Sequence, residues 1–285
     1  MAAGRAQTGR PETAHPGRSA PGQASLVARR LDGRVADAGI HAVATEMATA
    51  LSFNGVAHVV MMTTPQDEED FATGFALSEG IVTDPGEIGE VDLRMSDDGL
   101  LVDIRVPQDR HHALLERRRN LVGQSGCGIC GLEELEDAIR PLSPLTARPA
   151  LTYAAAHRAM ESLRDHQPLN AATGAVHAAA CADWNGDILA AREDVGRHNA
   201  LDKLIGHMAR AGIAPDNGFI LLSSRCSYEL VHKTVSCRCP ALVTVSAPTT
   251  LAVRLAEQAG LTLIALARSD SMLCFNDPHD LFRGE

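Results

Sequence analysis

The sequence predicts an α/β protein with a smaller α+β unit, residues 30–122, and a larger unit, residues 145–285, that contains a mostly parallel sheet. The clearest observation is an alternation in the second half, where the apolar runs "GFILL", "ALVTVS" and "LTLIALA" are separated by two helical patterns. Such an alternation requires right-handed crossovers between parallel strands. In the first half, "VDLRMSDDGLLVDIRV" alternates on both sides of Asp-Asp-Gly, which is typical of an antiparallel hairpin.

The composition is that of a globular protein and argues against several functional classes. Hydrophobic residues make up 45% of the 285 positions, enough for a sizeable core. Aromatic residues at 3% and a formal net charge of −10 argue against a nucleic-acid-binding protein. No apolar run approaches the roughly 20 residues of a membrane helix. Seven scattered cysteines fit thiols kept reduced in a cytoplasmic protein better than a secreted disulfide framework.

The elements of the first half follow from local patterns. Residues 1–29 are rich in Gly, Pro, Ala and Arg and are predicted to be a disordered tail. Residues 57–64, "AHVVMMTT", are predicted to be a buried strand. Pro65 and the acidic residues after it favour a helix start, and Gly80 favours the end of that helix. The pattern "HHALLERRRNLV" predicts a short polar helix.

The second half begins with a glycine–cysteine loop and a connecting helix, residues 123–144, followed by a helix predicted over residues 148–166. The segment "AVHAAACADWNGDILAARED" predicts a hairpin that turns at Asn185-Gly186, which is a strong hairpin signal. The next helix, "GRHNALDKLIGHMARAG", has apolar residues at helical spacing and ends at Gly212.

Three polar segments are expected at one edge of the predicted sheet: residues 192–199, "REDVGRHN"; residues 223–227, "SSRCS"; and residues 246–249, "SAPT". Ligands of such sheets bind at the carboxyl ends of the strands, where helix N-termini also favour anions. The cationic or switchable donors in and after these segments are Arg197, His198, Lys203, Arg225 and Lys233. This edge is a candidate site for a phosphate-bearing ligand. The alternative is a set of ordinary capped helices with solvated charges.

The sheet pattern is also typical of nucleotide deaminases, but the zinc chemistry of those enzymes is not expected. That chemistry needs an H-x-E motif and a P-C-x-x-C motif. His177 is followed by Ala178 and Ala179, and P-C-x-x-C does not occur. We therefore predict no catalytic metal.

The stretch "GQSGCGICGLEELEDAI" contains Cys127 and Cys130 in a C-x-x-C motif, and three chemistries use such a pair. A structural zinc site would need a second pair, which Cys237 and Cys239 could supply. A dithiol redox site would place the motif at a helix start directly after a strand, and no strand precedes it closely. The flanking glycines favour a third use, in which an exposed thiol carries a sulfur atom as a persulfide between two partners.

Several motifs together make the chain resemble one family. "GCGICG", "REDVGRHNALDKLIG", "SSRCSYELVHKT", "VTVSAPTTLAVRLAEQAGLTLIALAR" and "DEEDFATGFALSEGI" resemble the formate dehydrogenase accessory sulfurtransferase family (FdhD), over about residues 40–280. The chain departs from the usual family pattern at three positions of the expected site, one of which is Ser271, where a basic residue is usual. Ser224 stands where glycine is usual, and Cys226 is an additional thiol.

The resemblance implies a function. The family accepts persulfide sulfur from a cysteine desulfurase and passes it to the bis(guanine dinucleotide) molybdenum cofactor, the bound substrate, before that cofactor enters the formate dehydrogenase catalytic subunit. It also implies a cytidine-deaminase-like fold without zinc in the larger unit, and a homodimer. Cys127 matches the persulfide carrier and Cys130 the second cysteine of the motif. By the same resemblance, the segment Leu266, Ala267, Arg268, Ser269, Asp270 and Ser271 contacts the cofactor.

The expected cofactor crevice comprises that segment and five further residues, Asp194, Arg197, His198, Arg225 and Lys233. A second function, from a different class, is that of a chaperone that shields and delivers the cofactor without using Cys127. A third is a structural protein stabilised by zinc.

Overall fold

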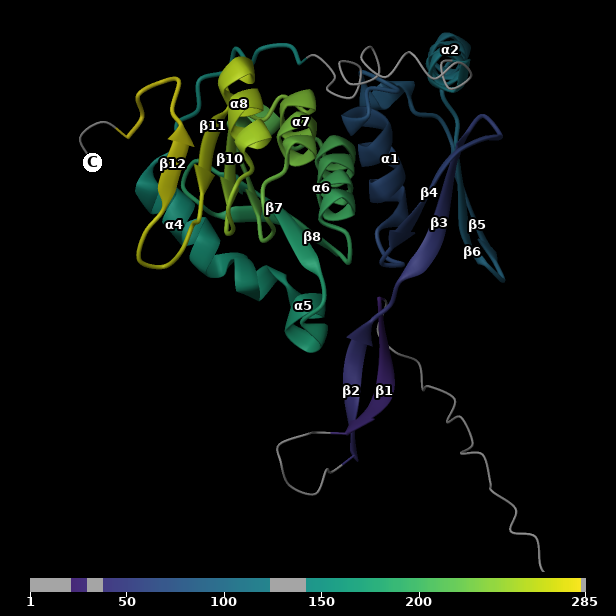
Figure 1. The fold of residues 1–285 in the computed structure, drawn as a ribbon, viewed down its shortest axis with the longest axis horizontal. Helices are drawn as coiled ribbons and strands as arrows, with labels where there is room; N and C mark the ends of the chain where they lie inside the picture. Colours follow the sequence, from purple (N-terminus) through teal and green to yellow (C-terminus); the bar gives the residue numbers. More distant parts are fainter. Residues whose placement is uncertain (1–21, 30–37, 124–141, 283–285) are drawn as a thin grey trace, which may run out of the picture.

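The computed structural model describes residues 22–29, 38–123 and 142–282. Figure 1 shows two sheets with helices packed between and beside them. The predictions for residues 1–21, for Cys127 and Cys130, and for the helix expected after these cysteines lie outside the described residues.

The first unit is a four-stranded sheet with one face covered by a helix. Its strands are β3 (Met47–Phe53), β4 (Val56–Thr63), β5 (Val91–Ser96) and β6 (Gly99–Ile104), in the order β4-β3-β6-β5. The helix α1 (Glu68–Ser78) packs Phe71 and Phe75 against inward residues of β3 and β6. The 3-10 turn η1 (Pro85–Glu87) lies between α1 and β5, and α2 (Gln108–Gly123) follows β6.

The second unit is a six-stranded sheet covered on both faces. Its strands are β7 (His177–Asp183), β8 (Ile188–Asp194), β9 (Gly218–Leu222), β10 (Ala241–Thr244), β11 (Thr262–Ala265) and β12 (Leu273–Asn276). Helices α6 (Arg197–Ala211), α7 (Tyr228–Ser236) and α8 (Thr250–Ala259) cover one face. Helix α4 (Tyr153–Ser162) covers the other. The short helices η3 (Leu163–His166), α5 (Pro168–Thr173) and η4 (Pro215–Asn217) complete this unit.

The α/β class is confirmed, but the prediction of a mostly parallel sheet is wrong. The strand order is β12-β11-β10-β9-β7-β8, and only the pairs β9–β10 and β10–β11 are parallel. The hairpin β7–β8 inserts next to β9 with β7 antiparallel to it, and β12 returns antiparallel to β11. Short connections cannot produce parallel neighbours, so a hairpin and a closing strand both add antiparallel pairs. That this unit shares the cytidine-deaminase fold stays a prediction, as do the unit boundaries.

Two expectations about the first unit also need correction. Residues Gln23–Arg29 form β1, paired antiparallel with β2 (Ala38–Ala44), so this part of the predicted tail is a strand. Strand β4 is not buried, because it is an edge strand whose outer face is uncovered by the described residues, leaving Val60 64% exposed. Strand β4 has a continuous apolar run in the sequence, and burial cannot be inferred from such a run alone.

The two units meet through α1 and α6, which lie side by side in Figure 1. Their backbones approach closely because each helix has a glycine at the contact. A Cβ atom on Gly74 would lie 1.7 Å from the carbonyl oxygen of Asp202, and one on Gly206 would lie 1.9 Å from that of Asp70. Any larger residue would force the helices apart.

Candidate functional site: a cationic strand edge

Four strands of the second sheet end at one edge. Strands β9, β10 and β11 are parallel, and β8 runs in their direction because β7 is antiparallel to both β8 and β9. The three polar segments of the sequence analysis therefore do converge, together with the segment that follows β11. The strand β7 starts at this same edge, with His177 as its first residue.

Backbone hydrogen bonds join the loops at this edge. The N–H of Cys226 donates to the carbonyl of Ala247 (3.1 Å), and the N–H of Thr249 donates to that of Cys226 (3.0 Å). The N–H of Leu266 donates to the carbonyl of Ser246 (3.2 Å). Loops that satisfy one another's backbone groups in this way present their side chains from a fixed base.

Cationic side chains cluster at the edge. Arg197, at the first turn of α6, and Arg225, after β9, lie close enough to His177 to act on its charge. Burial and then these two guanidinium groups and His198 lower the pKa of His177. The Nε atom of Arg197 is buried and has no hydrogen-bond partner among the described residues. Because no described residue satisfies this donor, the first turn of α6 is a candidate position for binding an anion.

His177 is a site residue that the sequence analysis missed. The sequence around His177 bears only on zinc binding, because the place of His177 beside Arg197 and Arg225 depends on β7 being inserted between β8 and β9. No local pattern in the sequence predicts that insertion.

A small polar network fixes His198. Its Nε2 lies 2.9 Å from Oε2 of Glu229, and the hydroxyl of Ser227 donates to the same oxygen (2.9 Å). A carboxylate can only accept a hydrogen bond, so Nε2 of His198 carries the hydrogen that is donated to Glu229. The other ring nitrogen, Nδ1, does not take part in this hydrogen bond. Burial lowers the pKa of His198, although the neighbouring Glu229 raises it. The serine and the carboxylate meet the same ring nitrogen, which is not the arrangement of a hydrolase triad.

The segment Leu266–Ser271 forms a tight turn after β11. The N–H of Arg268 donates to the carbonyl of Ser271 (2.9 Å), and Nε2 of His157 lies 2.9 Å from the carbonyl oxygen of Ser269. Ala267 is buried, whereas the side chains from Arg268 to Ser271 are exposed. The exposed part of the segment can contact a ligand, and the side chain of Ala267 cannot.

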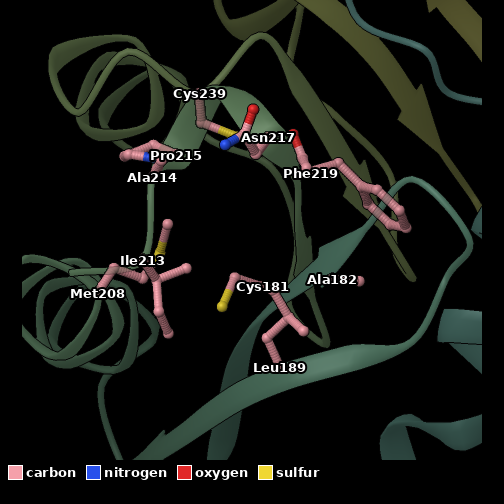
Figure 2. A pocket seen from close by; sticks show the side chains of 11 residues that line it. Cys181, Ala182, Leu189, Met208, Ile213, Ala214, Pro215, Asn217, Phe219 and Cys239 are labelled. Atoms are coloured by element: carbon pink, nitrogen blue, oxygen red, sulfur yellow. Dashed lines mark hydrogen bonds between the residues drawn. The ribbon is translucent and has the colours of Figure 1, made fainter. Parts of the chain in front are cut away.

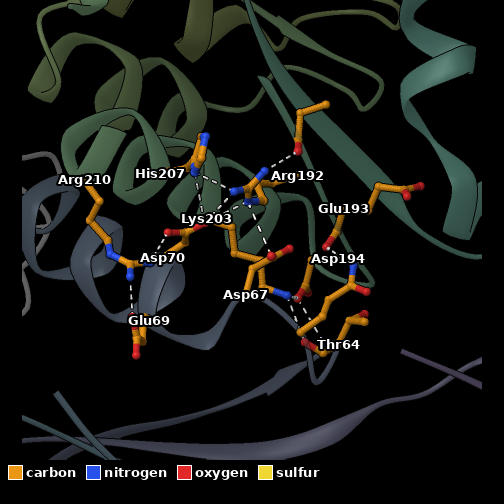
Figure 3. Close-up of polar contacts among 12 residues, drawn as sticks. Thr64, Asp67, Glu69, Asp70, Arg192, Glu193, Asp194, Lys203, His207 and Arg210 are labelled. Carbon is orange, nitrogen blue, oxygen red and sulfur yellow. Dashed lines mark hydrogen bonds and ion pairs between the residues drawn. The ribbon is translucent and has the colours of Figure 1, made fainter. Parts of the chain in front are cut away.

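Asp194 is buried, and Figure 3 shows its side chain beside Thr64 and Lys203, so it does not face the expected cofactor crevice. Its carboxylate accepts hydrogen bonds from the backbone N–H groups of Thr64 (2.9 Å) and Gly196 (2.8 Å). Lys203 lies 2.7 Å from the same carboxylate and donates to the carbonyl of Thr64. This pair therefore connects β8 and α6 to the end of β4.

Lys233 is also turned away from the strand edge. Its ammonium group contacts Asp202 (2.8 Å) and Glu79 (2.9 Å) between α7, α6 and α1, and it lies 5.5 Å from the centre of the Phe75 ring. Despite burial, these two carboxylates raise the pKa of Lys233. The structure gives Lys233 a role in joining the two units, not in contacting a ligand of the edge.

A third ion-pair cluster lies at the same junction (Figure 3). The buried Asp70 on α1 binds Arg192 (2.8 Å) and Arg210 (2.5 Å), and His207 lies 3.4 Å away. The charged residues of the "DVGRHNALDK" motif thus divide into two groups. Asp194, Asp202 and Lys203 hold the units together, while Arg197 and His198 remain at the edge.

The five described cysteines are poorly suited to nucleophilic chemistry. Burial raises the pKa of Cys226 and of Cys237 to about 12, that of Cys181 to about 11, and that of Cys239 well above its usual value. Cys181 and Cys239 line a small cavity of about 10 Å³, room for one water molecule at most (Figure 2). Cys274 is the exposed cysteine among the five. Its pKa is also raised, first by the partial desolvation of its thiol and then by the nearby charge of Asp277.

In the part of the chain that the structure describes, His, Cys, Asp and Glu side chains form no group of three or more that could hold a metal ion. Over the same residues, none of the helices has the length and apolar character needed to cross a bilayer.

The profile of the FdhD/NarQ family matches residues 44–282. The chain belongs to the FdhD/NarQ family. Among curated proteins, it is 48% identical over 236 residues to the "Sulfur carrier protein FdhD" of Bordetella bronchiseptica, covering 83% of this chain and 86% of that one. It is also 48% identical over 242 residues to the protein of the same name from Xanthomonas campestris pv. campestris, covering 85% and 86%. The family resemblance read from the motifs is therefore confirmed.

A solved structure shares the fold. The crystal structure of a candidate formate dehydrogenase accessory protein from Desulfotalea psychrophila superimposes with a TM-score of 0.70, covering 90% of this chain and 99% of that one. The two sequences are 22% identical, so this similarity establishes the arrangement of the FdhD/NarQ fold and no more.

Proposed function

We propose that this protein is a sulfur carrier that accepts persulfide sulfur from a cysteine desulfurase and delivers it to the bis(guanine dinucleotide) molybdenum cofactor of formate dehydrogenase. Cys127 is the carrier, Cys130 is its neighbour in the motif, and the strand edge holds the phosphates of the cofactor, which is the substrate. The partners are the desulfurase and the formate dehydrogenase catalytic subunit. The protein acts in the cytoplasm and as a homodimer. The names of the relatives in Bordetella and Xanthomonas support the sulfur-carrier role.

The observation that carries this proposal is the state of the other thiols. A thiolate, not a thiol, attacks sulfur, and burial in apolar surroundings suppresses the thiolate. The pKa of every described cysteine is raised. The remaining two of the seven cysteines, Cys127 and Cys130, lie outside the described residues, and the proposal assigns the carrier thiolate to Cys127 because the C-x-x-C motif resembles that of the family.

The strand edge supports the second half of the proposal. A pyrophosphate-linked cofactor needs donors that are not already neutralised by carboxylates. Arg225 is exposed, and Arg197 has a buried Nε atom without a partner among the described residues. Arginine groups bind phosphates with paired hydrogen bonds, and helix α6 adds its N-terminal N–H groups, which no side chain caps.

The loading step is a balanced thiol–persulfide exchange. The thiolate of Cys127 attacks the terminal sulfur of the desulfurase persulfide, and the S–S bond of that persulfide breaks. The donor cysteine leaves as a thiolate, and Cys127 becomes the persulfide. No external oxidant or reductant is consumed, since the sulfane sulfur only changes partners.

Intact-protein mass spectrometry tests the loading step. The wild-type protein, incubated with a cysteine desulfurase and cysteine, gains the mass of one sulfur atom, and a reductant reverses the gain. Cys127→Ala does not gain it. Cys274→Ala is the matched control, because Cys274 is the exposed cysteine among the described ones, and it loads like wild type. Loading of Cys127→Ala, or loss of loading in Cys274→Ala, would overturn the assignment.

The chaperone alternative makes a different prediction. It needs the strand edge but not the thiol, so Cys127→Ala would still give active formate dehydrogenase in a strain that lacks the wild-type protein. The unpartnered Arg197 Nε is compatible with either function, which is why the mass measurement comes first.

A further inference from the structure

His177 is placed at the cationic edge by a rigid part of the sheet. The N–H of the next residue, Ala178, donates to the hydroxyl of Ser223 (2.8 Å), and the N–H of Ser223 donates to the carbonyl of Ala178 (3.0 Å). The imidazole is half-buried on the side of the sheet that α6 covers. His177 therefore cannot leave the edge without disrupting the pairing of β7 with its neighbours.

The charged groups around His177 come from four elements. Arg197 and His198 belong to α6, and Arg225 follows β9. Glu229 on α7 is hydrogen-bonded to His198 and acts on His177 through that residue. Asp194 is the Cα partner of His177 on β8, but its carboxylate is bound by Lys203, Asn199 and backbone N–H groups. Positive charge near His177 thus exceeds the negative charge free to balance it.

An anion bound at this edge would reverse the balance. Without a ligand, burial and the arginines lower the pKa of His177, so the imidazole is neutral near neutral pH. A phosphate placed beside Arg197 and Arg225 offsets their repulsion and favours the imidazolium. Protonated imidazole is a donor at both nitrogens, which phosphate oxygens accept.

We propose that His177 is a further ligand-contacting residue of the strand edge and takes up a proton when a phosphate-bearing ligand binds there. The identity of that ligand rests on the proposed function, whereas the proton linkage rests on the arrangement of the edge itself. The sign follows from linkage, since binding that takes up protons strengthens as the pH falls. One group can contribute at most about tenfold in affinity per pH unit.

The probe is GDP, which has the phosphates and the base of one half of the proposed substrate. Titration calorimetry at about pH 6, 7 and 8 gives the dissociation constant. Repeating the titration at about pH 7 in two buffers of different ionisation enthalpy gives the number of protons taken up. We expect the wild-type protein to bind GDP at least about threefold more tightly per unit fall in pH, with net proton uptake. Sulfate, which stays a dianion over this range, is a second probe that removes any contribution from titration of the ligand.

His177→Gln keeps hydrogen-bonding capacity but cannot titrate. We expect its proton uptake and the slope of affinity against pH to fall to less than half of the wild-type values. His112→Gln, at an exposed position on α2, is the matched control and keeps the wild-type slope. NMR titration of the His177 ring in the wild-type protein is independent of the variant, and its pKa should rise when GDP or sulfate is added.

The outcomes separate the two ideas. If wild-type protein binds GDP with no pH dependence and no proton uptake, or if His177→Gln retains both, the inference is wrong and the proposed function stands. If wild-type protein binds neither GDP nor sulfate at any of these pH values, both the inference and the proposed cofactor site are wrong.

Discussion

Lys203 Nζ lies 2.7 Å from Oδ2 of Asp194, and the two side chains are 1% and 0% exposed. The pair is completed by Thr64, whose N–H donates to Asp194 and whose carbonyl accepts from Lys203. These contacts join the end of β4 to β8 and α6. Thr64 lies more than a hundred positions before both Asp194 and Lys203 in the chain. The sequence motif resembles a ligand-binding loop. Its residues Asp194 and Lys203, however, stabilise the junction between the two units.

The first prediction concerns the stability of this junction. Lys203→Met leaves the Asp194 carboxylate buried without a cation, and breaking one side of a buried ion pair costs about 3–5 kcal/mol. We expect a loss of this order in the free energy of unfolding, measured by urea titration with circular dichroism. Arg158→Met is the matched control, because Arg158 and Asp187 form a pair with side chains 62% and 65% exposed. That variant should lose less than about 1 kcal/mol. Equal losses in the two variants would contradict the role given to Lys203.

The second prediction separates the two kinds of cation that the motifs contain. Arg225→Gln removes an exposed guanidinium at the strand edge, so GDP affinity should fall about tenfold while the unfolding midpoint stays unchanged. Lys233→Met leaves Asp202 buried and unpaired, so the midpoint should fall. Calorimetric titration and thermal unfolding of both variants check this. If Lys233→Met lowered the affinity for GDP without lowering the unfolding midpoint, Lys233 would belong to the ligand site and not to the junction.

The α/β repeat was predictable because its signals are local. The strands β9, β10 and β11 and the helices between them follow from runs and periods in one stretch of chain, and the turn of the β7–β8 hairpin follows from Asn185-Gly186. The order of the strands is not local. Nothing in the hairpin states that β7 will pair with β9, and that pairing is what makes the sheet mixed and brings His177 to the edge.

The candidate site was predictable in part for a related reason. Loops after successive strands of one sheet meet, so Arg197, His198 and Arg225 could be grouped from the sequence. The direction of Asp194 and Lys233 could not, because their partners, Thr64 and Glu79, belong to the other unit. A charged side chain at the end of a strand can contact a ligand or can pair with a residue of the other unit. Only the packing of α1 on α6 shows which of these two applies to a given residue.

The third prediction is a pH effect at η1. The hydrogen bond from Arg110, then those from Thr83 and Asp84, lower the pKa of Glu87 to about 2. Since the folded pKa lies below the ordinary value of 4.5, the contacts contribute to stability above about pH 4.5 and this contribution is lost as the pH falls toward 2. Carbon-13 NMR titration of the Glu87 carboxyl should show the low pKa in wild type and a value nearer 4.5 in Arg110→Gln. Asp109→Asn, one position away, is the control and should leave the Glu87 pKa low.

The last prediction tests the thiol argument directly by alkylation. In native protein at about pH 8, iodoacetamide should leave Cys181, Cys226 and Cys239 unmodified, because these side chains are at most 3% exposed and burial raises their pKa. Cys274 is accessible but has a raised pKa, so it should react slowly. Peptide mapping of a time course gives the rate at each site, and the same course in denaturant shows that every thiol is intact. The sulfur-carrier proposal requires Cys127 to react faster than Cys274. A Cys127 that reacts no faster than Cys274 would favour the chaperone function, since a carrier must present a thiolate to its donor.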